Sequence, residues 1–234
     1  MFTKYNIIDL HNHTFWSDGI NSSKEIVENA IEHNINAIGI TDHFNTVKCP
    51  SIQPNELDGY LREMKYIKEM YSSKIKVFIG IEINCIPFPE SLNNLPYDKL
   101  NALDFVLIEN LDHLSPAICL EDILKDIKKL KIPVGLAHTD IFKLANKNIE
   151  KGGLNYILDL LKTNNIFWEI NSNSSYDSFN SIIYNNDDSD VLNLFKKIQE
   201  HQINITVGSD THSIDDYEKN RLKQGNVARR LLTQ

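Results

Sequence analysis

Long apolar runs are missing from this sequence. No stretch approaches the roughly 20 consecutive apolar residues that a membrane-spanning helix requires. The N-terminal segment MFTKYNIIDLHNH also lacks the apolar core and small-residue cleavage site of a signal peptide. We therefore expect a cytoplasmic protein that does not engage a membrane.

Cysteines are few and poorly placed for structural cross-links. Cys49, Cys85 and Cys119 are odd in number, far apart and form no C-x-x-C pair. This spacing supports neither a disulfide framework nor a zinc ribbon. We expect reduced cysteines that mostly pack in the interior.

Positive charge is in deficit. The chain carries 24 lysines and arginines against 32 acidic residues, which gives a formal net charge of −8. Proteins that hold long nucleic acids by their phosphates need a basic face, so extended nucleic acid is not an expected partner. A small phosphorylated substrate held through metal ions is compatible with this charge.

Strand and helix patterns alternate along the chain. Short apolar runs rich in β-branched residues predict seven strands, at residues 6–13, 36–43, 76–84, 103–110, 132–138, 166–171 and 203–212. Segments of helical period predict helices at residues 22–34, 56–71, 121–130, 155–163, 191–201 and 215–232. Ser22 and Glu25 have the spacing of a capping box at the first helix. Residues 172–190 are polar and almost without periodicity, so we expect a loop or lid there.

This alternation predicts an α/β fold. Strands that are apolar on both faces and alternate with helices form parallel sheets covered by helices. Seven such units favour a distorted (β/α)7 barrel of the TIM type, in a single domain that spans residues 1–234. A doubly wound open sheet is the alternative, but it would place one ligand crevice at a switch point, whereas nearly every predicted strand here ends in a chemically reactive residue.

Histidines gather at these strand ends. His11 and His13 are two residues apart, so on a strand they share a face, with Cα atoms about 6 to 7 Å apart, and can reach one metal together. Six of the eight histidines lie at or just beyond predicted strand ends. The other two, His33 and His201, lie at predicted helix C-termini, where the helix dipole favours a cation. We assign those two a structural role.

The motifs DLHNHTFWSDG, ITDHF, GIEIN, AHTD and VGSDTH follow one another on successive strands. In this order they resemble the motifs of the polymerase and histidinol phosphatase (PHP) family of metal-dependent phosphoesterases, over residues 7–212. The resemblance implies a distorted seven-stranded barrel with two or three divalent ions, zinc, manganese or iron, at its C-terminal face.

The same resemblance implies a set of metal ligands. One ion would be held by His11, His13, Glu82 and Asp210. A second would share Glu82 and take His138. A third would use Asp18, His43 and His212.

The fourth strand departs from the family pattern. The family usually ends this strand with another histidine ligand, but here the segment reads DFVLIENLDHL and offers Glu109 and His113. These two residues are about 13 Å apart on an extended strand, so both cannot easily bind one ion. We predict that His113 is the ligand. Glu109 is the alternative, and a two-metal or weakened site is the fallback.

Clustered divalent ions lower the pKa of a bridging water and clamp phosphate oxygens. The expected nucleophile is therefore a metal-bridging hydroxide, and the sequence has no G-x-S-x-G or P-loop pattern that would suggest another. Asp210, His212 or a metal-bound water would protonate the leaving group. Lys143 is a candidate phosphate-binding cation and Arg62 a weaker one, although surface lysines and arginines are common.

Three further side chains could belong either to the site or to the structural framework of the barrel. Glu169 and Asn171 would point into the barrel and either bind substrate or orient the metal ligands, unless they form only a polar layer. Trp16 lines the pocket wall or belongs to the core.

The resulting hypothesis is a small-molecule phosphomonoesterase resembling histidinol-phosphatase. A phosphodiesterase, nuclease or nucleotide phosphatase of the PHP type is the nearest alternative. A metal-free scaffold or binding subunit is an alternative of another class, and the retained ligand set argues against it.

Overall fold

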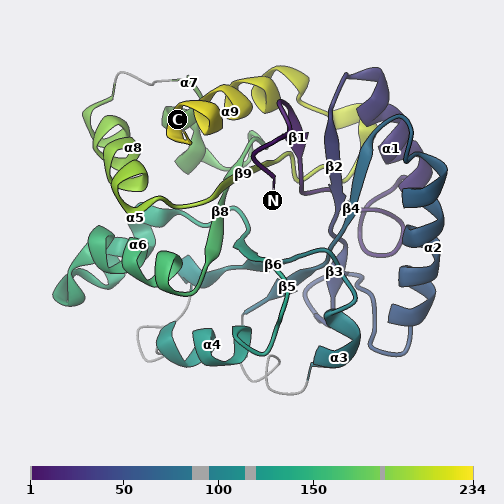
Figure 1. Ribbon diagram of the computed structural model, residues 1–234, viewed down its shortest axis with the longest axis horizontal. Helices are drawn as coiled ribbons and strands as arrows, with labels where there is room; N and C mark the ends of the chain where they lie inside the picture. Colours follow the sequence, from purple (N-terminus) through teal and green to yellow (C-terminus); the bar gives the residue numbers. More distant parts are fainter. Residues whose placement is uncertain (1, 86–94, 114–119, 185–187, 234) are drawn as a thin grey trace.

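Parallel strands occupy the centre of the computed structural model, and helices cover their outside (Figure 1). The structure describes residues 2–85, 95–113, 120–184 and 188–233. The strands are β1 (Ile8–Asp9), β2 (Ala37–Ile40), β3 (His43–Phe44), β4 (Lys76–Ile79), β5 (Glu82–Asn84), β6 (Val106–Glu109), β7 (Val134–Leu136), β8 (Ile166–Asn171) and β9 (Ile205–Gly208). The helices are α1 (Ser23–Glu32), α2 (Leu57–Met70), α3 (Tyr97–Leu100), α4 (Leu120–Ile127), α5 (Ile141–Lys147), α6 (Gly153–Thr163), α7 (Asn180–Tyr184), α8 (Ser189–His201) and α9 (Lys219–Leu232).

The strands form two parallel sheets, ordered β1-β2-β4 and β3-β5-β6-β7-β8-β9. Two of the predicted strands are divided between these sheets, since residues 36–43 form β2 and β3 and residues 76–84 form β4 and β5. Backbone hydrogen bonds continue across the break, from Gly80 N–H to the Ile40 carbonyl at 2.8 Å and from Glu82 N–H to the Asp42 carbonyl at 3.0 Å. The division therefore distorts the strand layer without interrupting it.

The first and last strands are also joined. Leu10 N–H donates to the Val207 carbonyl at 2.8 Å, and Asp210 N–H donates to the His11 carbonyl at 2.9 Å. Strand order and these contacts agree with the predicted distorted (β/α) barrel of the TIM type. A doubly wound open sheet would leave its two edge strands apart.

One end of the barrel is filled by aromatic rings. Phe2 packs edge-on against Phe78, Phe105 and Phe167, with ring centroids 5.1 to 5.8 Å apart. Phe105 directly precedes β6, Phe167 is the second residue of β8, and Phe78 lies within the short strand β4. Because this end is packed with apolar side chains, the polar chemistry of the barrel is confined to the opposite, C-terminal end.

Helix signals in the sequence are largely confirmed. The Ser22 hydroxyl and the Glu25 carboxylate form both halves of the predicted capping box of α1. His33 and His201 lie at helix C-termini, where each ring Nδ1 is 2.8 Å from the carbonyl oxygen four residues earlier. The structure adds three helices that were not predicted, α3, α5 and α7.

The expectation of a loop at residues 172–190 was wrong in part. Helix α7 lies inside this segment, and it forms because Phe179, Ile182 and Ile183 supply a buried apolar face. Cys49 and Cys85 are free thiols, whereas Cys119 lies outside the described residues. Within the described ranges, no helix is both long enough and apolar enough to cross a membrane.

Candidate metal centre

Eight of the nine predicted metal ligands meet at the C-terminal end of the barrel. The eight are His11, His13, Asp18, His43, Glu82, His138, Asp210 and His212. They come from segments far apart in the sequence, and the parallel arrangement brings the ends of these segments together. Their nitrogen and oxygen atoms form overlapping groups.

The first group contains His11, His13 and Glu82, whose donor atoms all lie within 4.8 Å of one another. The Nε2 atoms of His11 and His13 are 3.1 Å apart. Oδ1 of Asp210 lies 3.1 Å from His13 Nε2 and 3.4 Å from His11 Nε2. The geometry thus assembles the same four residues that the family resemblance assigned to one ion.

The second group contains His13, Asp18, His43 and His212. Oδ1 of Asp18 lies 3.3 Å from His212 Nε2, and Oδ2 of Asp18 lies 3.6 Å from His43 Nε2. The imidazoles of His13 and His212 stack at 4.1 Å. This group contains the three residues expected to bind a third ion, Asp18, His43 and His212, and His13 is its fourth member.

The third group contains His43, Glu82 and Glu109. Nε2 of His138 lies 3.0 Å from Glu82 Oε1 and 3.8 Å from Glu109 Oε2. Glu82 therefore stands between the first and third groups, as expected of a carboxylate that bridges two ions.

The structure brings Glu109, not His113, to this cluster. Strand β6 ends at Glu109, Asn110 takes a left-handed φ of 68°, and the chain then forms a 3-10 turn over Leu111–His113. The His113 side chain is 53% exposed and pairs with Asp112 at 3.3 Å. The prediction for His113 assumed that the strand continued beyond Glu109, and it does not.

Two of the predicted ligands have unusual backbone conformations. His138 has φ 28° and Asp210 has φ 54°, in or near the left-handed region that residues other than glycine rarely adopt. Such conformations cluster at functional sites because the surrounding structure must hold them in place. Each lies two residues after a short strand, β7 or β9, and its side chain enters the cluster.

Glu169 and Asn171 lie behind the ligands. Oε2 of Glu169 is 3.0 Å from His11 Nδ1, and the backbone N–H of His138 donates to Oε1 of Glu169. Asn171 donates its amide to Glu169 at 2.9 Å. Glu169 and Asn171 are both fully buried. This placement favours the orientation of metal ligands over direct contact with a substrate.

A second buried carboxylate, which the sequence analysis did not single out, is Asp42. It accepts hydrogen bonds from the Thr14 N–H at 2.7 Å and from the Ser17 hydroxyl at 2.8 Å. The Ser17 hydroxyl in turn lies 3.4 Å from His13 Nδ1. Asp42 directly precedes His43 in the motif ITDHF, and this adjacency is the signal that could have identified it.

Several atoms of the cluster are buried without a hydrogen-bond partner. Among the described residues, these atoms include Oε2 of Glu82 and Oε1 of Glu109, which lie 3.1 and 3.7 Å from Nδ1 of His43. Burying polar and charged atoms without partners is costly. Divalent cations would satisfy them, and imidazole and carboxylate are the ligands that zinc, manganese and iron accept. The donor set therefore fits a metal centre.

Electrostatics agree with this reading. Burial opposes ionisation of Asp210, but the positive charge on His11 and the hydrogen bond from His13 outweigh it and hold the pKa of that carboxyl well below its usual range. Burial lowers the pKa of His212, yet the hydrogen bond to Asp18 and the charge of Asp210 raise it to about 9. In the absence of cations, the raised pKa values of His11, His138 and His212 favour protonated imidazoles that offset the negative charge of the carboxylates, whereas burial lowers the pKa values of His13 and His43.

Two further residues at the cluster were missed by the sequence analysis. The ring of Tyr176 stacks on His138 at 4.6 Å with an interplanar angle of 10°. Burial, with the nearby charge of Asp210 next, raises the pKa of the Tyr176 hydroxyl. Lys48, on the loop after β3, places Nζ 2.9 Å from Glu109 Oε2. Neither residue belongs to a recognisable motif, and only the fold places them at the site.

Neither of the predicted phosphate-binding cations pairs with a carboxylate of the three groups, within the described residues. Nζ of Lys143 is 3.4 Å from Asp112, and Arg62 is exposed on α2. Trp16 donates its indole N–H to Glu63 and packs edge-on against Tyr60. The Trp16 ring is therefore partly buried against the core, in agreement with its expected role as a core aromatic.

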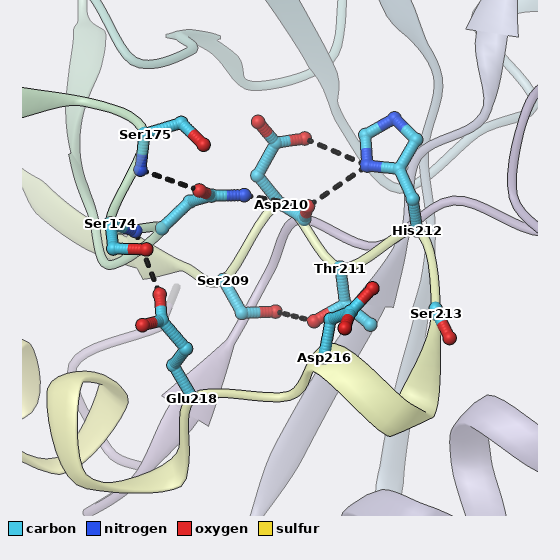
Figure 2. A pocket seen from close by; sticks show the side chains of 10 residues that line it. Ser174, Ser175, Ser209, Asp210, Thr211, His212, Ser213, Asp216 and Glu218 are labelled. Atoms are coloured by element: carbon cyan, nitrogen blue, oxygen red, sulfur yellow. Dashed lines mark hydrogen bonds and ion pairs between the residues drawn. The ribbon is translucent and has the colours of Figure 1, made fainter.

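A polar cavity of about 400 Å³ opens beside the cluster (Figure 2). Asp210 and His212 line one side of it, and Asp216 and Glu218 line another. Serine and threonine hydroxyls supply much of the remaining wall, including those of Ser174, Ser175, Ser209, Thr211 and Ser213. A ligand in this cavity would contact the metal centre on one side and carboxylates on the other.

The barrel and its buried cluster define a class, that of α/β-barrel proteins with a metal centre at the C-terminal mouth. Comparison with known protein families matches the PHP domain over residues 9–173. The chain belongs to the PHP domain family of metal-dependent phosphoesterases.

Solved structures of similar fold support this assignment. The histidinol phosphate phosphatase of Lactococcus lactis, solved with zinc, L-histidinol and phosphate, aligns with a TM-score of 0.65 and 17% identity, over 97% of this chain and 94% of its own. A chain from work on the metal-dependent tyrosine phosphatases YwqE of Bacillus subtilis and CpsB of Streptococcus pneumoniae aligns with a TM-score of 0.54 and 19% identity, over 93% of this chain and 84% of its own. At these identities the likeness establishes the fold. Among curated protein sequences, none matches significantly.

Proposed function

We propose that this protein hydrolyses small phosphomonoesters, using two or three divalent ions held at the barrel mouth. The observation that carries the proposal is the buried histidine and carboxylate cluster, with its unpartnered atoms, beside a polar cavity. The ions would be zinc, manganese or iron. When bound, they would supply an activated water and a Lewis acid for the phosphate oxygens.

The number of ions is limited by shared ligands. His13 and His43 each belong to two of the groups, and a neutral imidazole offers one lone pair to a metal. Each of these histidines therefore serves one ion at a time. The proposed ligand set carries Glu109 in place of His113, because Glu109 lies in the cluster.

Leaving-group protonation is better assigned to His212 than to Asp210. Asp210 is buried with a lowered pKa and stays ionised, whereas the His212 side chain is 39% exposed, lines the cavity and has a pKa raised to about 9. This role requires a proton on His212 Nε2, so it excludes a metal ion at the same atom. His212 is a donor in a two-ion centre and a ligand in a three-ion centre.

The cavity favours a polar leaving group. Carboxylates of Asp216 and Glu218 on its wall attract hydrogen-bond donors or a positive charge. The Lactococcus lactis protein, whose fold is shared, was solved with the amine L-histidinol and phosphate. We therefore propose an amine-bearing phosphomonoester of the histidinol phosphate kind as the substrate class.

The catalytic unit we propose spans residues 1–234 as one domain. The family match ends at residue 173, but Asp210 and His212 lie beyond it and complete the ligand set. Apolar residues as far along as Leu232 belong to the same hydrophobic core as Phe2, which supports a single folding unit.

Two measurements test this function. Protein purified without chelator should contain at least two transition-metal ions per chain, and with added manganese it should cleave p-nitrophenyl phosphate faster than bis(p-nitrophenyl) phosphate. In a screen of histidinol phosphate, nucleotides and short oligonucleotides, the amine-bearing histidinol phosphate should be hydrolysed fastest. Faster cleavage of the bis-ester would support a phosphodiesterase, and a metal-free protein would support a scaffold.

A further inference from the structure

Lys48 is the cation that the fold brings to the metal centre. Its Nζ lies 2.9 Å from Oε2 of Glu109. Among the residues that the structure describes, no other lysine or arginine pairs with a carboxylate of the three metal-binding groups. The nearest rival from the sequence, Lys143, pairs with Asp112, which is outside these groups.

The two partners differ in exposure. The Glu109 side chain is fully buried, whereas the Lys48 side chain is 51% exposed. The lysine therefore reaches from the solvent-facing rim down to a carboxylate inside the cluster. A long, flexible side chain in this position can turn toward the mouth of the site without unfolding any packed element.

Glu109 also has unused coordinating capacity. Oε2 accepts from Lys48 and from the Asn110 amide, but Oε1 has no hydrogen-bond partner and lies 3.7 Å from His43 Nδ1. A divalent ion bound by His43, Glu82 and Glu109 would neutralise this carboxylate from the other side. The ammonium of Lys48 would then lose much of the attraction that holds it there.

From these contacts we infer that Lys48 is a metal-dependent phosphate-binding residue. Without cations it neutralises Glu109; with cations on Glu109 it becomes available to the phosphate group of the substrate. The inference rests on the proposed function, which brings a phosphate to this mouth. It also accounts for phosphate recognition in a chain whose buried arginines serve the fold, since Arg221 and Arg229 donate to backbone carbonyls.

Binding of inorganic phosphate tests this role without turnover. Calorimetric titration with phosphate measures the phosphate affinity of each zinc-loaded protein. The proteins are the wild type, Lys48→Met, Lys48→Arg and the matched control Lys143→Met. Losing one charge-assisted hydrogen bond should weaken phosphate binding roughly tenfold in Lys48→Met. Lys48→Arg should keep most of the affinity, and Lys143→Met should match the wild type. Zinc content should be the same in all four proteins.

A spectroscopic readout tests the dependence on metal. Reductive methylation with ¹³C-formaldehyde labels the lysines, and the signal missing from Lys48→Arg identifies Lys48. This signal should shift when zinc is added and shift again when phosphate is added to the zinc-loaded protein. In the metal-free protein, phosphate should leave it unchanged.

Specific results would overturn the inference. The inference is wrong if Lys48→Met with its full zinc content binds phosphate as tightly as the wild type. It is also wrong if Lys143→Met loses as much phosphate affinity as Lys48→Met, or if Lys48→Met loses zinc. Failure of the proposed function looks different, because a protein that hydrolyses no phosphomonoester can still bind phosphate through Lys48. Conversely, full phosphatase activity in Lys48→Met would leave the function intact and exclude the lysine.

Discussion

Oε2 of Glu169 lies 3.0 Å from Nδ1 of His11, and both side chains are fully buried. The carboxylate holds a proton on Nδ1 and directs Nε2 toward Glu82 and Asp210, where a bound cation would take its lone pair. Because the negative charge also makes the imidazole a stronger donor, this contact sets both the direction and the strength of His11 as a ligand. The relationship underlies the first prediction.

Replacing Glu169 by Gln keeps the size of the side chain but removes its charge. We expect metal affinity to fall about 10- to 100-fold, the usual effect of losing such a partner. Competition with a zinc-binding dye measures the change. The exposed Glu200→Gln is the control, and equal affinities in the two variants would contradict the role.

Replacing Tyr176 by Phe removes a hydroxyl while retaining the stack on His138. We expect unchanged metal content and a lower kcat, since the phenol is close enough to feel the charge of Asp210, which lines the proposed substrate cavity. Burial, with the charge of Asp210 next, raises the pKa of this phenol, so it acts as a neutral hydrogen-bond donor. Steady-state kinetics and metal analysis test this, with the exposed Tyr66→Phe as control. A fall in metal content would instead give Tyr176 a purely structural role.

Glu109 and His113 can be separated directly. Glu109→Gln should lower the number of bound ions or their affinity, because its carboxylate lies in the cluster. His113→Ala should leave both unchanged, since that side chain is half-exposed and pairs with Asp112. Elemental analysis after dialysis against limiting zinc measures the outcome. Zinc loss only in His113→Ala would restore the prediction from sequence.

Removing metal should destabilise the fold. Buried carboxylates such as Glu82 and Glu109 then repel each other without a bound cation. Ligand at 100 times its Kd stabilises by about 2.7 kcal/mol, which for a chain of this size corresponds to roughly 5 to 10 °C in Tm. Scanning calorimetry with and without chelator measures the shift. An unchanged Tm would argue against bound metal in the purified protein.

Metal binding should release protons. In the metal-free protein His212 has a pKa raised to about 9, so at pH 7.5 its imidazole is mostly protonated. The charge of Glu169 likewise raises the pKa of His11, against the effect of burial. Cations must displace these protons, so zinc affinity should fall as the pH drops below about 9.

The proton release is measured by titrating zinc in two buffers of different ionisation enthalpy. The apparent enthalpy should differ between the buffers, and His212→Gln should reduce the difference. Identical enthalpies in both buffers would show that the ligands bind metal without losing protons.

The sequence by itself determined the layers of the fold and most of the candidate site. Strand and helix periodicity are local properties, so they predicted the α/β class, and Ser22 and Glu25 predicted a helix start that the structure contains. The metal-competent residues follow strand ends, and the parallel topology brings these ends together. The convergence of these residues at one barrel mouth could therefore be predicted before the structure was known, whereas the grouping of His11, His13, Glu82 and Asp210 around one ion came from the resemblance to the PHP family.

Only the tertiary structure decided what depends on the path of the chain after each strand. A left-handed residue at Asn110 ends β6 early, which turns His113 outward and leaves Glu109 in the cluster. The approach of Lys48 to Glu109 and of Tyr176 to His138 joins residues 61 and 38 positions apart. Such contacts carry no local periodicity, because they arise from how loops fold over the barrel mouth.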